Sequence, residues 1–157
     1  MPRAQATAAD RSCVFCEIAA GRVAAARVLD DGASIAFLDH RPLFPGHVLL
    51  VPRAHVPTLL DLAPAELGPL FANAQRIAAA LERGLGAQGS FVAVNNRVSQ
   101  SVPHLHVHVV PRSRGDGLRG FFWPRHAYAD PAEQQRVADA IRRELERAGP
   151  PGSSQLE

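Results

Sequence analysis

The segment Ser101-Val-Pro-His104-Leu-His106-Val-His108-Val-Val-Pro-Arg112 decides how this chain is expected to fold. It holds three of the chain's seven histidines, at every second position, with apolar residues between them. Successive side chains of a β-strand point to opposite faces. The segment therefore predicts a strand with three histidines on one face and an apolar face toward a core, formed by Leu105, Val107 and Val109. Histidine transfers protons, attacks electrophiles and binds metals near neutral pH, so the histidine face is a predicted reactive surface.

The residues alone leave three interpretations of this histidine face open. The first is chance alternation on an exposed strand, although such strands favour Thr, Lys and Glu. The second is a metal site. His104 and His106 could both reach one metal, but the rise of a strand separates His104 from His108 by about 13 Å, against metal–nitrogen bonds of about 2.1 Å, so all three cannot easily share one ion. The third is phosphoryl chemistry, in which one imidazole attacks phosphorus and a neighbour holds a phosphoryl oxygen.

The run His104-Leu-His106-Val-His108-Val-Val resembles the histidine triad signature of the HIT superfamily of nucleotide hydrolases and transferases. Three further segments resemble the family in the expected order: Val14-Phe-Cys-Glu-Ile18, Ile35 to Pro52 with its Pro45-Gly46-His47, and Gln100-Ser101. Together these motifs cover roughly residues 13 to 126. Several ordered motifs are far more specific than any one of them.

Hydrophobic patterning predicts an α+β fold. Strands are expected at 27–29, 34–38, 47–51 and 90–95 and over the histidine segment, with Asp30-Asp31-Gly32 as a hairpin turn. Helices are expected at 13–20, from near Pro64 to Gly84 or Gly86, and after Asp130-Pro131. This order predicts an antiparallel sheet of about five strands with the helices to one side. The resemblance implies the same HIT-like fold, with a long helix and a C-terminal helix, in a homodimer that shares one sheet.

Length and composition predict one small domain. A chain of 157 residues, 46% of them apolar, can bury one ordinary core. We expect a flexible N-terminus over residues 1–10, a single HIT domain over 11–148 and a disordered tail over 149–157. Residues 116–126, rich in glycine, proline and aromatic residues, are expected to form a surface loop near the leaving group.

Charge and hydropathy narrow the location and the partners. The formal net charge of +2 gives no case for nucleic-acid binding. No stretch approaches the roughly 18 apolar residues of a membrane span, and Met1 to Asp10 lacks the apolar run of a secretory signal. The sequence therefore predicts a cytoplasmic protein without a membrane or nucleic-acid partner.

Cys13 and Cys16 are the only cysteines, spaced Cys-x-x-Cys. This spacing fits a redox pair, half a zinc site or two buried thiols. In zinc-containing bacterial members of the resembled family, the other two ligands are a histidine after the third strand and the first triad histidine. These positions match His55 and His104 here. The resemblance thus implies a structural zinc held by Cys13, Cys16, His55 and His104, and unmetallated cysteines with a surface His55 remain the alternative.

The resemblance also assigns the catalytic residues. His106, the middle triad position, would attack the α-phosphorus of a purine nucleoside 5′-phosphoryl compound and form a nucleotidyl-histidine intermediate. His108 and Ser101 would stabilise the charge on the phosphoryl oxygens, and His47 would line the same site. No catalytic metal is required. Dinucleoside polyphosphates and nucleoside phosphoramidates are the expected substrate types. The alternatives are a nucleotide-binding regulatory protein with little turnover and a metal-dependent enzyme that uses the strand histidines.

The resemblance also implies which residues bind the nucleoside. Asp39 matches the acidic residue that binds the ribose hydroxyls, and a turn cap is its alternative role. The expected base-pocket residues, which could equally be ordinary core, are Val14, Phe15 and Ile18. The polar side chains expected near phosphate or sugar are Asn95 or Asn96, and Gln100. The stretch Asn95 to Gln100 is about two residues shorter than the better-known eukaryotic pattern and lacks its glycine before the glutamine.

Overall fold

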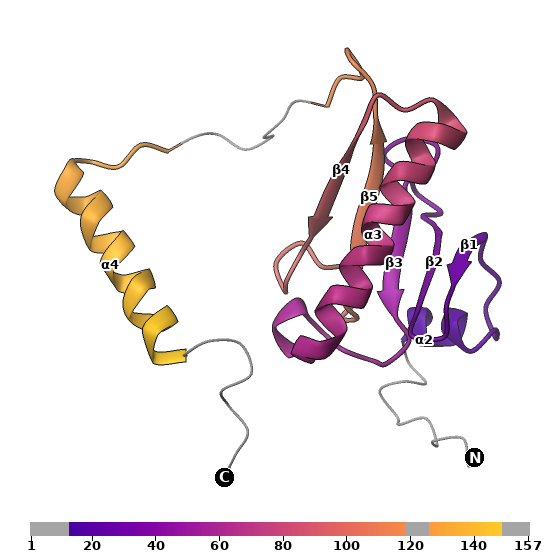
Figure 1. Cartoon of the computed structure of the whole chain (residues 1–157), viewed down its shortest axis with the longest axis horizontal. Coiled ribbons are helices and arrows are strands. Elements are labelled where there is room, and N and C mark those ends of the chain that lie inside the picture. Colours follow the sequence, from indigo (N-terminus) through magenta and orange to yellow (C-terminus); the bar gives the residue numbers. More distant parts are fainter. Residues whose placement is uncertain (1–12, 119–125, 149–157) are drawn as a thin grey trace, which may run out of the picture. The chain divides into compact units, whose positions relative to one another are not determined.

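The computed structural model describes residues 13–118 and 126–148 (Figure 1). The strands are β1 (Arg27–Asp30), β2 (Ser34–Leu38), β3 (Val48–Pro52), β4 (Gly89–Val94) and β5 (Val107–Arg112). The helices are α2 (Val14–Ala19), the short 3-10 helix η1 (Leu59–Asp61), α3 (Pro64–Leu85) and α4 (Pro131–Ala148). The predicted flexible N-terminus, the predicted disordered tail and most of the predicted loop over 116–126 lie outside the described residues.

The five strands form one sheet in the order β1-β2-β3-β5-β4. All four pairings are antiparallel, and β3 aligns with β5 so that Leu49 stands opposite His108. The predicted α+β class and the five-stranded antiparallel sheet are therefore confirmed. Within the described residues, β1 and β4 form the two edges of this sheet.

Alternating side chains of the sheet build a core layer on each face. Val48 and Leu50 of β3 pack on the face covered by α3, which Figure 1 shows crossing the sheet. Leu49 and Val51 of the same strand pack on the other face with α2. The expectation that the helices lie to one side is thus wrong for α2. Its buried Phe15 and Ile18 give the second face of the sheet an apolar cover of its own.

The histidine segment is only partly a strand. β5 begins at Val107, so His104 and His106 precede it, contrary to the predicted strand over the whole run. The reason is local hydrogen bonding: the N–H of His104 is donated to the Val102 carbonyl and that of Leu105 to the Val56 carbonyl, instead of to a neighbouring strand. The alternation of faces nevertheless holds, because Leu105, Val107 and Val109 pack in the α3 layer.

Helix α3 begins and ends where its sequence signals predict. Pro64 stands in its first turn, where the missing N–H costs no hydrogen bond, and Gly86 caps its end in the left-handed conformation (φ 68°). Contacts divide the chain into one unit up to Asp116 and another from Gly117, which holds α4. The single domain over 11–148 therefore stays a prediction. No helix among the described residues combines the length and apolar character needed to cross a bilayer.

Candidate active site and metal cluster

The ring of His106 is held from one side by its own chain. It is 4% exposed, and its Nδ1 lies 2.7 Å from the carbonyl oxygen of His104. A carbonyl oxygen only accepts hydrogen bonds, so Nδ1 carries the proton and donates it. The neutral ring then has its lone pair on Nε2, the tautomer that a nucleophilic imidazole needs.

His47 and His108 form a second, directly bonded pair of rings. The backbone N–H of Leu43 donates to His47 Nδ1 at 3.2 Å, and His47 Nε2 lies 3.0 Å from His108 Nδ1. Because a backbone N–H only donates, His47 accepts at Nδ1 and donates from Nε2. His108 then accepts at Nδ1 and keeps its proton on Nε2. The Leu43 amide thereby fixes the tautomers of both rings.

Burial keeps this pair neutral. The pKa of His108 is lowered from 6.5 to about 4, mainly by burial and also by the nearby His106 and His47, against the opposite effect of the Asp39 carboxylate. The pKa of His47 is also lowered by burial, which outweighs the opposite effect of Asp39. Both rings are therefore neutral at pH 7, as the tautomer assignment requires. The ring centroids of His106 and His108 lie 4.8 Å apart, so the three histidines make one cluster.

Asp39 lies beside this cluster at the end of β2. Its Oδ1 accepts the backbone N–H of Arg41 at 2.9 Å, so the turn-cap role is real. Its Oδ2 lies 3.7 Å from His47 Nδ1. One carboxylate oxygen thus fixes the turn while the other faces the histidines. Ribose binding by Asp39 stays a prediction, and the cap does not compete with it.

The predicted base-pocket residues divide into two groups. Phe15 and Ile18 are buried at 7% and 6% exposure, whereas Val14 is 43% exposed. The Phe15 ring meets His106 edge to face, with centroids 5.3 Å apart. Phe15 and Ile18 are therefore core residues, and Phe15 also forms one wall beside the His106 ring.

In the predicted polar loop before the histidines, side chains form hydrogen bonds to backbone groups of the protein. Gln100 accepts from the Arg97 N–H at 2.8 Å and donates to the Pro57 carbonyl at 2.6 Å. Asn95 donates to the Ser99 carbonyl at 3.4 Å, and Ser101 is exposed. Phosphate or sugar contacts of these side chains stay predictions. Asn96, which accepts the Leu59 N–H at 2.9 Å, fastens this loop to η1.

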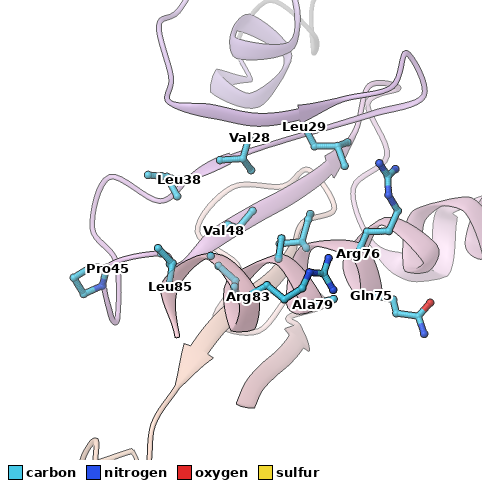
Figure 2. A pocket seen from close by; sticks show the side chains of 15 residues that line it. Val28, Leu29, Leu38, Pro45, Val48, Gln75, Arg76, Ala79, Arg83 and Leu85 are labelled. Atoms are coloured by element: carbon cyan, nitrogen blue, oxygen red, sulfur yellow. The ribbon is translucent and has the colours of Figure 1, made fainter. Parts of the chain in front are cut away.

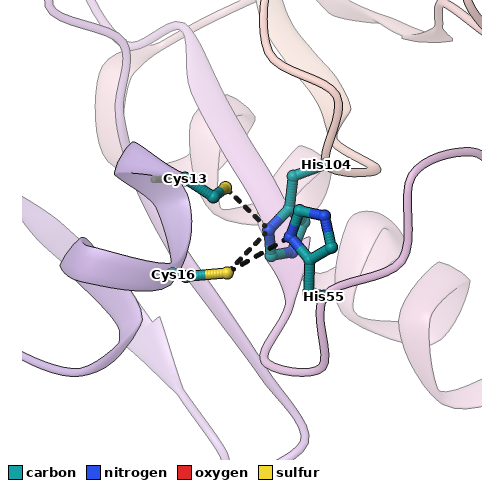
Figure 3. A group of neighbouring side chains, drawn as sticks. All are labelled: Cys13, Cys16, His55 and His104. Carbon is teal, nitrogen blue, oxygen red and sulfur yellow. Dashed lines mark hydrogen bonds between the residues drawn. The ribbon is translucent and has the colours of Figure 1, made fainter. Parts of the chain in front are cut away.

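Cys13, Cys16, His55 and His104 converge on one point, as Figure 3 shows. Their ligand atoms all lie within 4.8 Å of one another. The cysteine sulfurs lie close to the Nδ1 atoms of the histidines, at 3.4 Å (Cys13–His104), 3.3 Å (Cys16–His55) and 3.5 Å (Cys16–His104).

These distances fit a zinc site. Zinc–sulfur bonds of about 2.3 Å and zinc–nitrogen bonds of about 2.1 Å at tetrahedral angles place sulfur and nitrogen about 3.6 Å apart. His104 Nε2 lies 2.8 Å from the Pro52 carbonyl and donates to it. This second contact is the usual one for a metal-binding imidazole, because it leaves the Nδ1 lone pair for the ion. The four predicted ligands thus fit zinc in type, number and spacing.

Comparison with known proteins identifies the family. A family model described as HIT domain matches residues 20–115. The chain belongs to the HIT family. The match includes His47, His55 and the triad of this HIT protein but begins after Cys13 and Cys16.

Three similar proteins put this HIT protein in context. An uncharacterized HIT-like protein of Mycobacterium tuberculosis is 41% identical over 108 residues, which are 68% of this chain and 75% of that protein. The asymmetrical bis(5′-nucleosyl)-tetraphosphatase of Schizosaccharomyces pombe is 40% identical over 85 residues, 53% of this chain and 47% of that protein. The crystal structure of a Zn-bound histidine triad family protein from Mycobacterium smegmatis is 36% identical, with a TM-score of 0.67 over 89% of this chain and 99% of that one.

An open cavity of about 1150 Å³ lies on the face of the sheet that α3 covers, between α3 and strands β1 and β2 of this HIT protein (Figure 2). Its walls are mostly apolar and include Val28, Leu38 and Leu85, with Arg76 and Arg83 of α3 also lining it. None of the described histidines lines this cavity. It is therefore separate from the histidine cluster and from the metal cluster.

Proposed function

We propose that this HIT protein is a nucleotide hydrolase or nucleotidyltransferase that acts at the α-phosphorus of purine nucleoside 5′-phosphoryl compounds. The observation that carries the proposal is the hydrogen bond from His106 Nδ1 to the His104 carbonyl, which leaves Nε2 as the nucleophilic atom. The His47–His108 pair beside it supports the same chemistry, because His108 keeps a proton on Nε2 for a phosphoryl oxygen.

In the first step, His106 Nε2 forms a bond to phosphorus while the bond from phosphorus to the leaving oxygen or nitrogen breaks. The leaving group keeps that electron pair and takes up a proton. In the second step, the oxygen of water or of another acceptor forms its bond to phosphorus, the N–P bond breaks, and its electron pair returns to Nε2. The acceptor releases a proton, and the nucleotide leaves with its new bond. Splitting the displacement in two replaces one difficult step by two easier ones.

The neighbouring residues have separate tasks in this scheme. His108 Nε2–H and the Ser101 hydroxyl donate to the phosphoryl oxygens, where negative charge grows in the transition state. His47 holds the His108 tautomer. Asp39 Oδ2 accepts from the ribose, and the His104 carbonyl stabilises the cationic ring of the phosphorylated His106 through its Nδ1–H.

Cys13, Cys16, His55 and His104 would hold a structural zinc ion, and the name of the Mycobacterium smegmatis protein supports zinc as the metal. When bound, such an ion ties α2 to the histidine segment. No step of the proposed reaction passes through it.

The substrate type is proposed from a relative. The name of the Schizosaccharomyces pombe protein, a bis(5′-nucleosyl)-tetraphosphatase, favours dinucleoside polyphosphates, with nucleoside phosphoramidates as a second type. We also propose a cytoplasmic homodimer that shares its sheet across β4, an edge strand with Val92 43% exposed. Sedimentation at several protein concentrations tests the dimer.

A substrate panel tests the function. Wild-type protein, His106→Ala and the control Glu82→Ala, at an exposed position of α3, are compared on diadenosine polyphosphates, nucleoside phosphoramidates, nucleoside sulfates and nucleotide sugars, with and without inorganic phosphate. We expect turnover by the wild type and by Glu82→Ala, and a loss of at least about a thousandfold in His106→Ala. Tight nucleotide binding by all three without turnover would instead indicate a regulatory protein. Turnover that is lost on metal removal from a still folded chain and is insensitive to His106→Ala would indicate a metal-dependent enzyme.

A further inference from the structure

We propose that the metal cluster is a positioning device for the nucleophile, acting through His104. This inference rests on the proposed role of His106. The metal cluster consists of Cys13, Cys16, His55 and His104. It is linked to the histidine cluster through His104, because the ring of His104 belongs to the metal cluster and its backbone carbonyl accepts the hydrogen bond that orients His106. Metal binding at the His104 ring and tautomer selection at the His106 ring therefore meet in a single residue.

The His104 side chain is fixed at both ring nitrogens. Its Nε2 donates to the Pro52 carbonyl at the end of β3, and its Nδ1 faces both cysteine sulfurs. The residue is 0% exposed, so no solvent replaces these contacts when they weaken. A metal bond of about 2.1 Å to Nδ1 restrains the ring far more than sulfur contacts of 3.4 Å and 3.5 Å do. Ligation thereby limits the rotation of the whole residue, including its carbonyl.

Helix α2 supplies a second link between the two clusters. It carries Cys16, begins directly after Cys13, and places Phe15 between these ligands in sequence. The Phe15 ring lies edge to face against His104 and His106, with centroid separations of 5.9 Å and 5.3 Å. A cluster that holds α2 in place thus also holds the aromatic wall beside the His106 ring. In this scheme His104 and Phe15 are positioning residues.

The consequence concerns the His106 tautomer. When the His104 carbonyl points at Nδ1, the ring carries its proton there and Nε2 is free to attack. When the carbonyl is loosened, the proton divides between the two nitrogens and part of the protein carries a blocked Nε2. Removal of an outer-shell orienting contact typically costs about tenfold to a hundredfold in activity. We expect a fall of that size in adduct formation upon metal removal, with nucleotide affinity largely kept.

The test reads the tautomer directly, with zinc itself as the probe. Nitrogen NMR of the histidine side chains is recorded on the full chain loaded with zinc, after chelation, and after reloading, with circular dichroism as the check on folding. We expect His106 to be the Nδ1–H tautomer alone in the loaded protein, a mixture after chelation, and the single form again after reloading. His108 serves as the internal control, because its tautomer is set by His47 and Leu43. A folded, zinc-free chain that keeps a single Nδ1–H form at His106 and an unchanged rate of adduct formation overturns the inference.

If chelation unfolds the chain, a substitution tests the same inference. His55→Ala removes one ligand but leaves His104, its Pro52 contact and Phe15 in place, and His40→Ala, whose side chain is 88% exposed, is the matched control. At limiting zinc we expect loss of the metal and mixed His106 tautomers only in His55→Ala. A folded, zinc-free His55→Ala protein that keeps a single Nδ1–H form at His106 overturns the inference. A wild-type protein that forms no adduct with any nucleotide would count against the proposed function, whereas the NMR comparison decides the positioning role on its own.

Discussion

His108 should make the stability of this protein depend on pH in a definite window. Burial and, to a smaller extent, the neighbouring His106 and His47 lower its pKa from 6.5 to about 4 in the folded chain, so the unfolded chain binds more protons between these values. The free energy of unfolding therefore falls as the pH falls from about 6.5 toward about 4 and levels off below. With these two pKa values, the His108 contribution lost is about 1 kcal/mol at pH 5.5 and about 2 to 3 kcal/mol at pH 4.5.

The assay is urea unfolding of the wild type and of His108→Phe at pH 7.5, 5.5 and 4.5. Phenylalanine keeps a ring at this position but does not titrate. Both proteins retain the metal ligands, so acid effects on the metal cluster occur in both and largely cancel in the difference. The wild type should lose more stability than the variant by the amounts given above. Parallel losses in the two proteins over this range would refute the assignment of a half-buried, neutral His108.

Three further changes test other parts of the structure. Leu50→Ala, at a residue with 0% exposure in the α3 layer, should lower the free energy of unfolding by about 2 to 5 kcal/mol in urea melts, and a loss below 1 kcal/mol would contradict this packing. Gly46→Ala should cost about 1 to 3 kcal/mol by the same measurement, because Gly46 has a φ of 99° and a Cβ would lie 2.5 Å from Leu85 Cδ1; a neutral effect would argue against this geometry. Asp39→Asn keeps the cap to the Arg41 N–H but weakens acceptance from ribose, so KM for a nucleotide substrate should rise about tenfold to a hundredfold with kcat little changed, and an unchanged KM would exclude Asp39 from ribose binding.

The sequence predicted those parts of the fold that have strong local signals. The hairpin at Asp30-Asp31-Gly32, the start of α3 at Pro64 and its end at Gly86 depend on turn and cap chemistry, which neighbouring residues determine. Apolar runs located β2, β3 and β4. The alternation of histidines with apolar residues overstated the strand at His104 and His106, because the carbonyls that bind this stretch of backbone, those of Val56 and Val102, are brought there by tertiary packing.

The sequence predicted which residues form the site, but it did not predict the contacts that orient them. The spacing of the triad and of Cys13 and Cys16 pointed to the residues, but three decisive contacts come from the main chain. The His104 carbonyl sets the His106 tautomer, the Leu43 N–H sets the His47 tautomer and the Pro52 carbonyl holds the His104 ring. No side-chain pattern reports a backbone group. The Pro before His104 and the Pro-Gly before His47 are signals of irregular backbone that could have directed attention to these positions.

The central claim is that His106 Nε2 forms a transient bond to phosphorus. The most direct measurement is a rapid denaturing quench of wild-type protein during turnover of a labelled diadenosine polyphosphate, followed by peptide mass analysis at neutral pH. The account predicts a nucleotide monophosphate attached to the peptide that contains His106, formed before product appears and absent in His106→Ala. Turnover with no nucleotidylated peptide at any quench time, or with the label on another residue, would contradict it.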